Sequence, residues 1–203
     1  MVSKNVLHLS VIIVLLLVSV TGFAQTKVVV IPLAGDDVPI VPTSKTIFVT
    51  SATYNGNLGG ISGADDKCQA EADAANVPGI FRAWLSTDIT EDIPDRASFI
   101  KHDLPYNNVN GDNVANNFDD FLDDDFNSII DRVSTPDDIG LPIWTGTFFD
   151  GSGLVHNCNG WTDGTVNVPG YLGNSSGGVG GSFWSGGTFF GCHSDAHLYC
   201  FEQ

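Results

Sequence analysis

Four cysteines constrain the fold of this 203-residue chain more than any other feature. Cys192 and Cys200 stand close together near the C-terminus, in a stretch that predicts a short turn followed by a final strand. Cys68 lies far upstream in a predicted helix, and Cys158 comes just before Trp161. If the last strand is bonded to that helix, both ends of the domain are held around one core. Four cysteines allow three pairings, and the sequence alone does not choose among them.

The first residues have the composition of a secretory signal peptide. Lys4 precedes an apolar run over 11–20, and small residues stand at Gly22 and Ala24. The run is shorter than the roughly 20 apolar residues of a transmembrane helix. We expect cleavage after Ala24, no transmembrane segment in the mature chain, and a secreted, cell-surface or periplasmic location. An even cysteine count in an exported chain favours disulfides over metal thiolates.

The charge of the chain excludes several classes of partner. It has 24 acidic and 8 basic residues, for a formal net charge of −16. Nucleic acids, heparin-like polyanions and anionic membrane surfaces are bound by basic patches, so we expect none of them as a partner. The plainest interpretation of the acidity is solubility in an extracellular medium.

The sequence divides into three parts. Residues 1–24 are the predicted signal peptide. Residues 25–45 contain three prolines within a short stretch and are predicted to be an extended leader or linker, with an edge strand over 28–31 as the alternative. Residues 46–203 form the domain proper, which contains no internal repeat.

The first half of the domain predicts a strand, a helix and a second strand. β-branched and aromatic residues favour a strand over 46–50. Ser62 is expected to cap a helix, with Asp65 in its first turn and Cys68 among alanines on the inward face. The helix ends at 76–79. The strand over 80–86 follows, with Phe81, Ala83 and Leu85 on one face and Ile80, Arg82 and Trp84 on the other.

The second half predicts another helix and three strands. The helix covers 117–130, with apolar residues on one face and a run of aspartates on the other. Repulsion among the aspartates weakens it, so packing must hold it. Strands are expected at 143–147, 183–190 and 196–201, with a Gly/Ser-rich loop over 163–181. The expected class is α+β, with two helices on mixed, mostly antiparallel sheets.

The order of helix, cysteines and tryptophans carries a resemblance to a known family. The relevant segments are 63–65 with Cys68, 78–86, 95–96, 143–146, Cys158 with Trp161, and the hairpin from Cys192 to Cys200. They resemble the C-type-lectin-like fold and, within it, endostatin, a C-terminal fragment of certain collagens. Bacterial secreted proteins of uncharacterised function carry domains similar to this one, and the resemblance covers about residues 46–203.

The resemblance implies the pairs Cys68–Cys200 and Cys158–Cys192. The first closes the longer loop and contributes about 4–5 kcal/mol on the chain-entropy model, the second slightly less.

The ligand sites of those families do not carry over to this sequence. Residues 147–157 are too few for the long loop of calcium-dependent lectins, and 183–187 contain no carboxylate. Endostatin binds zinc through N-terminal histidines, and 25–50 contain none. Its heparin affinity depends on surface arginines, and only three remain here after cleavage. We therefore expect no cofactor.

A calcium site in the acidic middle of the chain is the alternative. Carboxylate oxygens are the ligands that calcium prefers, but the order of ligands in an EF-hand is missing. A solvated acidic face is the expectation. The candidate ligands are Asp112, Asp119, Asp120, Asp123 and Asp124.

The function expected from these patterns is non-catalytic recognition or adhesion, through an extracellular protein or a glycan. Trp161, Tyr171, Trp184 and Phe189 lie in or beside the Gly/Ser-rich loop, and aromatics among glycine and serine suit a recognition surface. For Trp161 and Trp184, core packing is the favoured interpretation, with a place on the recognition surface as the other. No histidine shows a base–nucleophile pattern, so a secreted hydrolase is kept only as the alternative.

Overall fold

The computed structural model describes residues 42–87, 99–123, 126–130, 132–133, 140–177 and 183–203. The predicted signal peptide, the alternative strand over 28–31, the 95–96 pair and Asp124 lie outside the described residues. All described residues belong to one compact unit, Val41–Gln203. Among them, no helix has both the length and the apolar character needed to cross a membrane.

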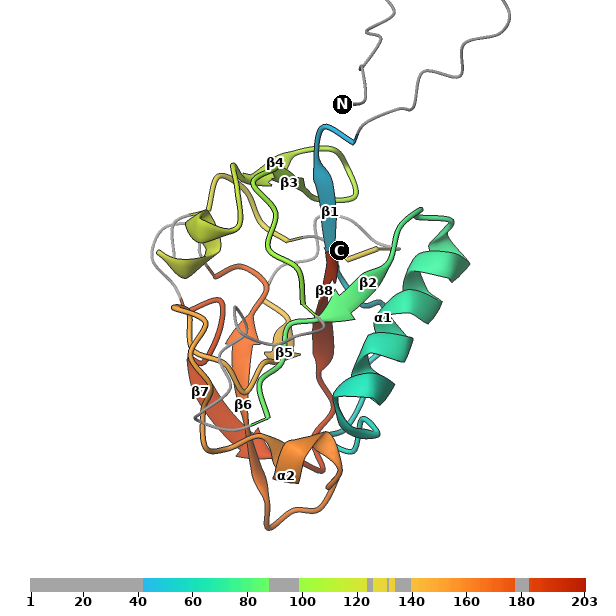
Figure 1. Cartoon of the computed structure of the whole chain (residues 1–203). Helices are drawn as coiled ribbons and strands as arrows, with labels where there is room; N and C mark the ends of the chain where they lie inside the picture. Colours follow the sequence, from blue (N-terminus) through green and yellow to red (C-terminus); the bar gives the residue numbers. More distant parts are fainter. Residues whose placement is uncertain (1–41, 88–98, 124–125, 131, 134–139, 178–182) are drawn as a thin grey trace, which may run out of the picture. The chain divides into compact units, whose positions relative to one another are not determined.

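The domain is α+β, as predicted, and its elements are shown in Figure 1. In chain order they are β1 (Lys45–Val49), α1 (Gly60–Ala75), β2 (Phe81–Ala83), β3 (Tyr106–Asn107), β4 (Asn113–Ala115), the 3-10 helix η2 (Asp119–Leu122), β5 (Pro142–Trp144), α2 (Cys158–Trp161), β6 (Pro169–Asn174), β7 (Thr188–Gly191) and β8 (His197–Glu202).

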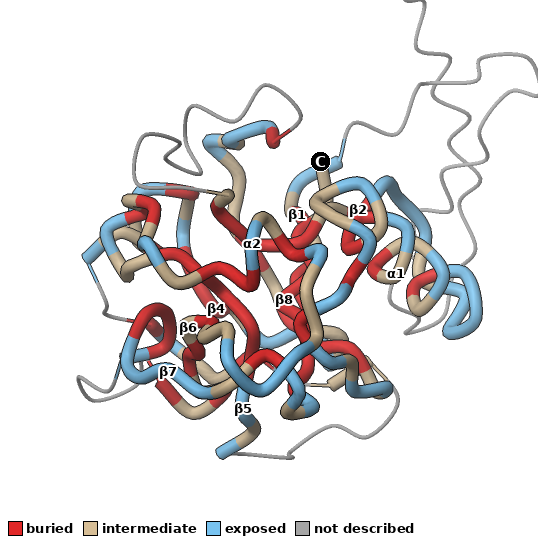
Figure 2. The backbone as a smooth tube through the Cα atoms, turned by 90° about the horizontal axis from the view of Figure 1, so that it is seen from below, coloured by how far each residue is buried: buried red, intermediate tan, exposed pale blue. Residues whose placement is uncertain are grey.

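The eight strands form one mixed sheet in the order β4-β3-β1-β8-β5-β6-β7, with β2 also paired to β8. The C-terminal strand β8 is central: it runs antiparallel to β1 and β2 and parallel to β5. It is buried along almost its whole length (Figure 2). The last strand of the chain therefore organises the sheet, and β7 forms one end of it.

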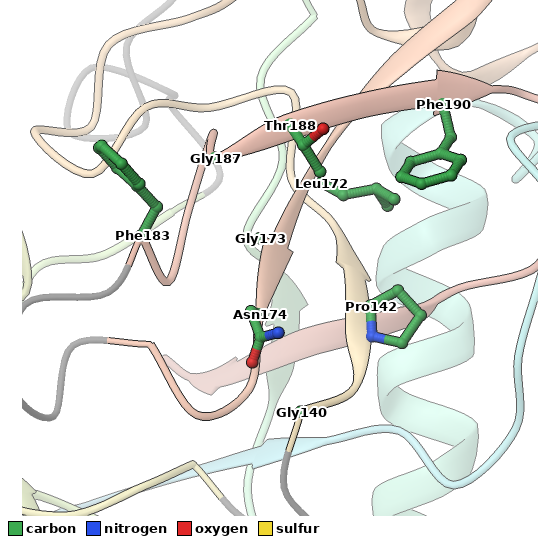
Figure 3. A pocket seen from close by; sticks show the side chains of 9 residues that line it. All are labelled: Gly140, Pro142, Leu172, Gly173, Asn174, Phe183, Gly187, Thr188 and Phe190. Carbon is green, nitrogen blue, oxygen red and sulfur yellow. The ribbon is translucent and has the colours of Figure 1, made fainter.

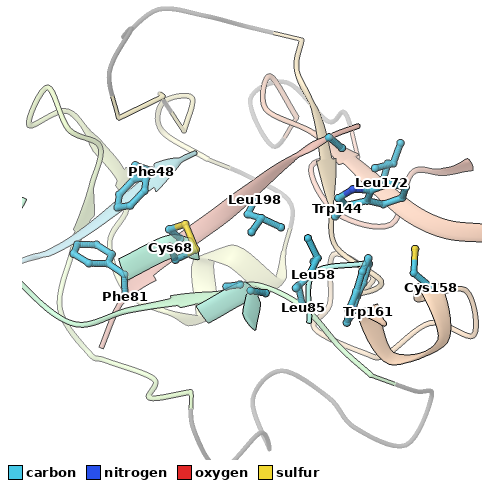
Figure 4. Packing of buried hydrophobic residues seen from close by; sticks show 14 of the residues in the cluster. Phe48, Leu58, Cys68, Phe81, Leu85, Trp144, Cys158, Trp161, Leu172 and Leu198 are labelled. Carbon is cyan, nitrogen blue, oxygen red and sulfur yellow. A yellow bond between two sulfur atoms is a disulfide. The ribbon is translucent and has the colours of Figure 1, made fainter. Parts of the chain in front are cut away.

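Alternate residues of the central strands face two separate hydrophobic cores. In β8, Leu198 and Cys200 belong to one core, and Tyr199 and Phe201 belong to the other. The first, the helix-side core, also contains the inward face of α1 and is shown in Figure 4. The second, the aromatic core, is built of Trp84, Phe99, Tyr106, Phe118, Phe121, Phe126, Trp184, Tyr199 and Phe201 with aliphatic neighbours.

Helix α1 begins earlier than predicted and without a side-chain cap. Its N-cap is Gly59, whose φ of 83° is left-handed, so Ser62 does not cap it. Asp65 is buried in the helix, where its carboxylate accepts hydrogen bonds from the N–H of Ala83 at 2.8 Å and from Arg82 at 3.3 Å. The helix begins at Gly60, so Asp65 lies beyond its first turn, contrary to the prediction, and its role is to join the helix to β2.

The predicted helix over 117–130 is wrong in extent, because only the four residues of η2 are helical among those described in this range, 117–123 and 126–130. Phe118, Phe121 and Phe126 are buried in the aromatic core without a continuous helix. The carboxylate of Asp120 accepts hydrogen bonds from both the backbone N–H and the side chain of Asn116, each at 2.8 Å. Local side-chain bonds of this kind compete with helix, and repulsion among the aspartates weakens it further.

The predicted loop over 163–181 contains a strand, β6, which pairs with β5 and β7. Glycine is required there by close approach of the backbone. A Cβ on Gly173 would collide with the carbonyl oxygen of Trp184, and one on Gly170 would lie 2.6 Å from the sulfur of Cys158. These glycines therefore mark tight packing in a sheet.

Two disulfides are present, Cys68–Cys200 and Cys158–Cys192, which is the pairing that the resemblance implied. The first joins α1 to the central strand β8. The second closes the segment that contains β6 and β7. Disulfides are typical of an oxidising compartment, such as the extracellular space or the periplasm.

Candidate recognition surface

The two tryptophans among the predicted ligand-binding residues lie in the cores. Trp161 is fully buried, and its indole N–H donates to the carbonyl of Ser86 at 2.8 Å. Trp184 is also fully buried and packs against Trp84, with 4.7 Å between ring centroids. Core packing, the interpretation favoured for them from the sequence, is what the structure shows. Of the four predicted residues, this leaves Tyr171 and Phe189 to face a ligand.

A left-handed turn explains why Trp161 points inward. Cys158, Asn159, Gly160 and Trp161 all have φ between 53° and 66°. The side chain of Asn157 holds this turn by accepting a hydrogen bond from the N–H of Gly160 at 2.9 Å. The turn directs Cys158 to its partner sulfur and Trp161 into the helix-side core.

Tyr171 and Phe189 form a cross-strand pair on the β6–β7 hairpin. They are directly opposite each other in the ladder, with ring centroids 5.7 Å apart. The ring of His156 stacks on Tyr171 at 5.5 Å and contacts Phe189 at 5.3 Å. The side chain of Phe189 is 55% exposed. We call His156, Tyr171 and Phe189 the hairpin surface.

No pattern in the sequence indicated that His156 belongs to this surface. It is placed there by a backbone contact between distant segments, because the N–H of Tyr171 donates to the carbonyl of His156 at 2.9 Å. An adjacent bridge between Asn157 and Gly170 continues the pairing. Only the folded hairpin brings the imidazole to the two aromatic rings.

The other face of the hairpin borders a pocket of about 220 Å³ (Figure 3). Leu172, Phe190 and Pro142 lie close together around it, and Phe183 lies farther along the same hollow. A neighbouring hollow shares those first three residues and adds Ser194 and Asp195. Phe190 is 53% exposed, so the hairpin presents an accessible phenylalanine on each face.

The part of the chain that carries the hairpin has no lysine and no arginine. Residues 133–203 contain no lysine and no arginine, while Asp150, Asp163, Asp195 and Glu202 are among their acids. Asp163 is partly exposed, and hydrogen bonds from Thr165 hold the pKa of its carboxyl below the usual range. Asp195 lines the neighbouring hollow together with Phe190, so one carboxylate lies beside the hairpin.

The candidate calcium ligands do not form a cluster. Asp120 accepts hydrogen bonds from Asn116, and Asp112 accepts one from the side chain of Asn108. Across the ranges that the structure describes, no group of three or more histidine, cysteine or carboxylate side chains could hold a metal ion. Asp124 is outside those ranges.

Three further groups with a shifted pKa lie outside the hairpin. Burial, and then Glu71, raise the pKa of Tyr54 to about 12. Burial is also the main cause that raises the pKa of Tyr106, and it lowers that of His102. Tyr106 belongs to the aromatic core and Tyr54 packs against the helix-side core, and burial is the largest cause of all three shifts.

The fold and surface define a disulfide-bonded α+β domain with an exposed aromatic hairpin. The chain belongs to the family described as protein of unknown function (DUF1554), whose model matches residues 51–177, more than half of the chain. The matched region includes α1, β5, α2 and β6 and ends before β7. No curated protein matches the chain.

Proposed function

We propose that this protein is a secreted or surface-associated, non-catalytic recognition or adhesion module, which binds an extracellular protein or a glycan through the hairpin surface without calcium. The observation that carries the proposal is the trio of His156, Tyr171 and Phe189, held in contact on a hairpin inside the Cys158–Cys192 segment.

The disulfide supports this role energetically. It fixes the segment at both ends before any ligand arrives, so less conformational entropy is lost on binding. Aromatic side chains supply large contact areas at low entropic cost, and they dominate the energetics of many interfaces. The exposed part of the Phe189 ring buries no surface in the folded chain, so folding stability does not explain why the ring is exposed.

We also propose that the fold is C-type-lectin-like and resembles that of endostatin. The cysteine pairing supports this, because it joins the first helix to the last strand and the Cys158 turn to the residue before the final hairpin. The calcium loop of lectins is absent from the sequence, which supports a calcium-free mode of binding.

The test is an array of glycans and extracellular matrix proteins probed with the mature chain, with and without a chelator. The best hit is then measured against Tyr171→Ala and Phe189→Ala. Ile80→Ala is the matched control, because Ile80 is 60% exposed but lies outside the hairpin. We expect each hairpin variant to weaken binding by about tenfold or more, and the control to bind as the wild type does.

Two results would contradict the proposal. Loss of binding in chelator would show that a metal is needed. Unchanged affinity in both folded hairpin variants would show that the hairpin surface is not the site.

A further inference from the structure

Among the strands of the described residues, β7 is the last on the side of the hairpin, so its outer edge is unpaired there. It ends the strand order, and Thr188, Phe189 and Phe190 are all exposed. Edge strands usually carry charges, proline or bulges that prevent pairing with another chain. The sequence Thr-Phe-Phe-Gly of β7 has no charge and no proline, and the register with β6 is regular.

The hydrogen-bond pattern shows which backbone groups of β7 face outward. The N–H of Cys192 donates to the carbonyl of Val168 at 2.7 Å, beside the end of the ladder. Bonded and non-bonded pairs alternate along an antiparallel ladder. Gly170–Phe190 is therefore a bonded pair, and Tyr171–Phe189 is not. The N–H and C=O of Phe189 point away from β6, toward the open edge.

Tyr171 gives independent support for this alternation. Its N–H donates to His156 and its carbonyl accepts from the N–H of Thr145 at 3.0 Å, so both groups point away from β7. Pro169, which has no N–H, also occupies a non-bonded position, opposite Gly191.

We propose that β7 binds an extended, basic segment of a partner protein, which adds to the sheet as a further strand. This rests on the proposed function and names the class of partner for the same hairpin. The segment bonds the outward N–H and C=O of Phe189. Its alternate side chains then contact the hairpin surface on one face and the Pro142–Leu172–Phe190 pocket on the other, as in strand addition generally.

The charge of the chain favours a basic partner segment over a second copy of the chain at the edge of β7. A second copy of the chain would bring together two hairpins from segments that lack lysine and arginine, at a net charge of −16 each. Like charges in such an interface are unfavourable, whereas a segment with alternating basic and apolar residues complements both the rings and Asp195. A glycan could stack on the aromatic rings, but it has no extended backbone to pair with the outward N–H and C=O of Phe189.

The probe is a fluorescein-labelled peptide of alternating lysine and valine, titrated with the mature chain and followed by fluorescence anisotropy. Phe189→Pro removes the outward N–H, and Phe189→Ala removes the same ring but keeps the N–H. We expect the proline variant to bind about tenfold more weakly than the alanine variant. A glutamate–valine peptide is expected not to bind.

Two further arms keep the test independent of the proline variant. Peptides N-methylated at alternate residues, in either phase, are titrated against the wild-type chain; we expect one phase to lose binding. Sedimentation of the chain alone reports self-association. Equal binding of the proline and alanine variants, together with no effect of N-methylation, would overturn strand addition. A dimer that Phe189→Pro dissociates would overturn the assigned partner, and binding of the glutamate–valine peptide would overturn the charge argument.

Different experimental outcomes would overturn the proposed function and the strand-addition inference. If the array yields only glycans that depend on Tyr171 and Phe189, the proposed function stands and strand addition is overturned. If no array hit depends on those two residues, the proposed function itself fails.

Discussion

The indole N–H of Trp84 donates a hydrogen bond to the hydroxyl of Ser185 at 3.0 Å, deep in the aromatic core. The same hydroxyl donates to the carbonyl of Thr147 at 2.6 Å. The segment that leads into β7 is therefore fixed to the strand after α1 and to the end of β5. The approach to β7 is thus held in place by buried hydrogen bonds through the Ser185 hydroxyl.

Ser185→Ala should destabilise the domain through this contact. It leaves the N–H of Trp84 and the carbonyl of Thr147 without this partner in the core, which costs about 1–3 kcal/mol. Urea unfolding measures the change. Ser62→Ala, at an exposed position of α1, is the control and should stay within about 0.5 kcal/mol of wild type. A neutral Ser185→Ala would mean that the contact does not hold the segment.

The two disulfides should differ in their contribution to stability. Their cysteines are 132 and 34 residues apart. On the chain-entropy model, Cys68→Ala with Cys200→Ala should lower the free energy of unfolding by about 5 kcal/mol, and the other pair by about 4 kcal/mol. Denaturant unfolding of the two double variants measures both. A larger loss from the shorter loop would show that native packing around Cys158 outweighs loop closure.

His102 should make stability depend on pH. Burial lowers its pKa, Lys45 adds to the lowering, and Glu202 opposes it. Because folding disfavours the protonated ring, this contribution is present above the unfolded pKa of about 6.5 and is lost as the pH falls below it. His102→Gln should therefore flatten the decline of the unfolding free energy below that pH. His193→Gln, at an exposed histidine, is the control. An unchanged slope in His102→Gln would contradict the assignment.

The ladder register can be tested at Phe190. Its N–H faces Gly170 in the inferred bonded pair, so Phe190→Pro removes a ladder bond and should cost about 1–3 kcal/mol. Phe189→Pro removes an outward N–H and should cost clearly less. Thermal unfolding compares the two variants. The reverse order would show that the alternation has been assigned to the wrong residues.

The regular elements with strong local patterns were predictable from the sequence. The alanine and Cys68 spacing gave α1, and β-branched and aromatic runs gave β1 and β8. Alternation over 80–86 also separated Phe81 from Trp84 correctly, because those residues face different cores.

The rest depended on long-range packing. β6 was missed because its glycines resemble a loop, although Gly173 is needed for the close approach of Trp184. The helix over 117–130 was expected because its phenylalanines have helical spacing, but burial of the rings does not require a helix. Two of four predicted surface residues are buried, since local sequence does not distinguish a core tryptophan from an exposed one.

The central claim is that the β6–β7 hairpin is the binding surface. Amide hydrogen exchange of the mature chain, with and without its best array hit, tests this most directly. The account predicts new protection in β6, β7 and residues 155–157, with α1 unchanged. Protection confined to α1, or to the acidic stretch around η2, would contradict it.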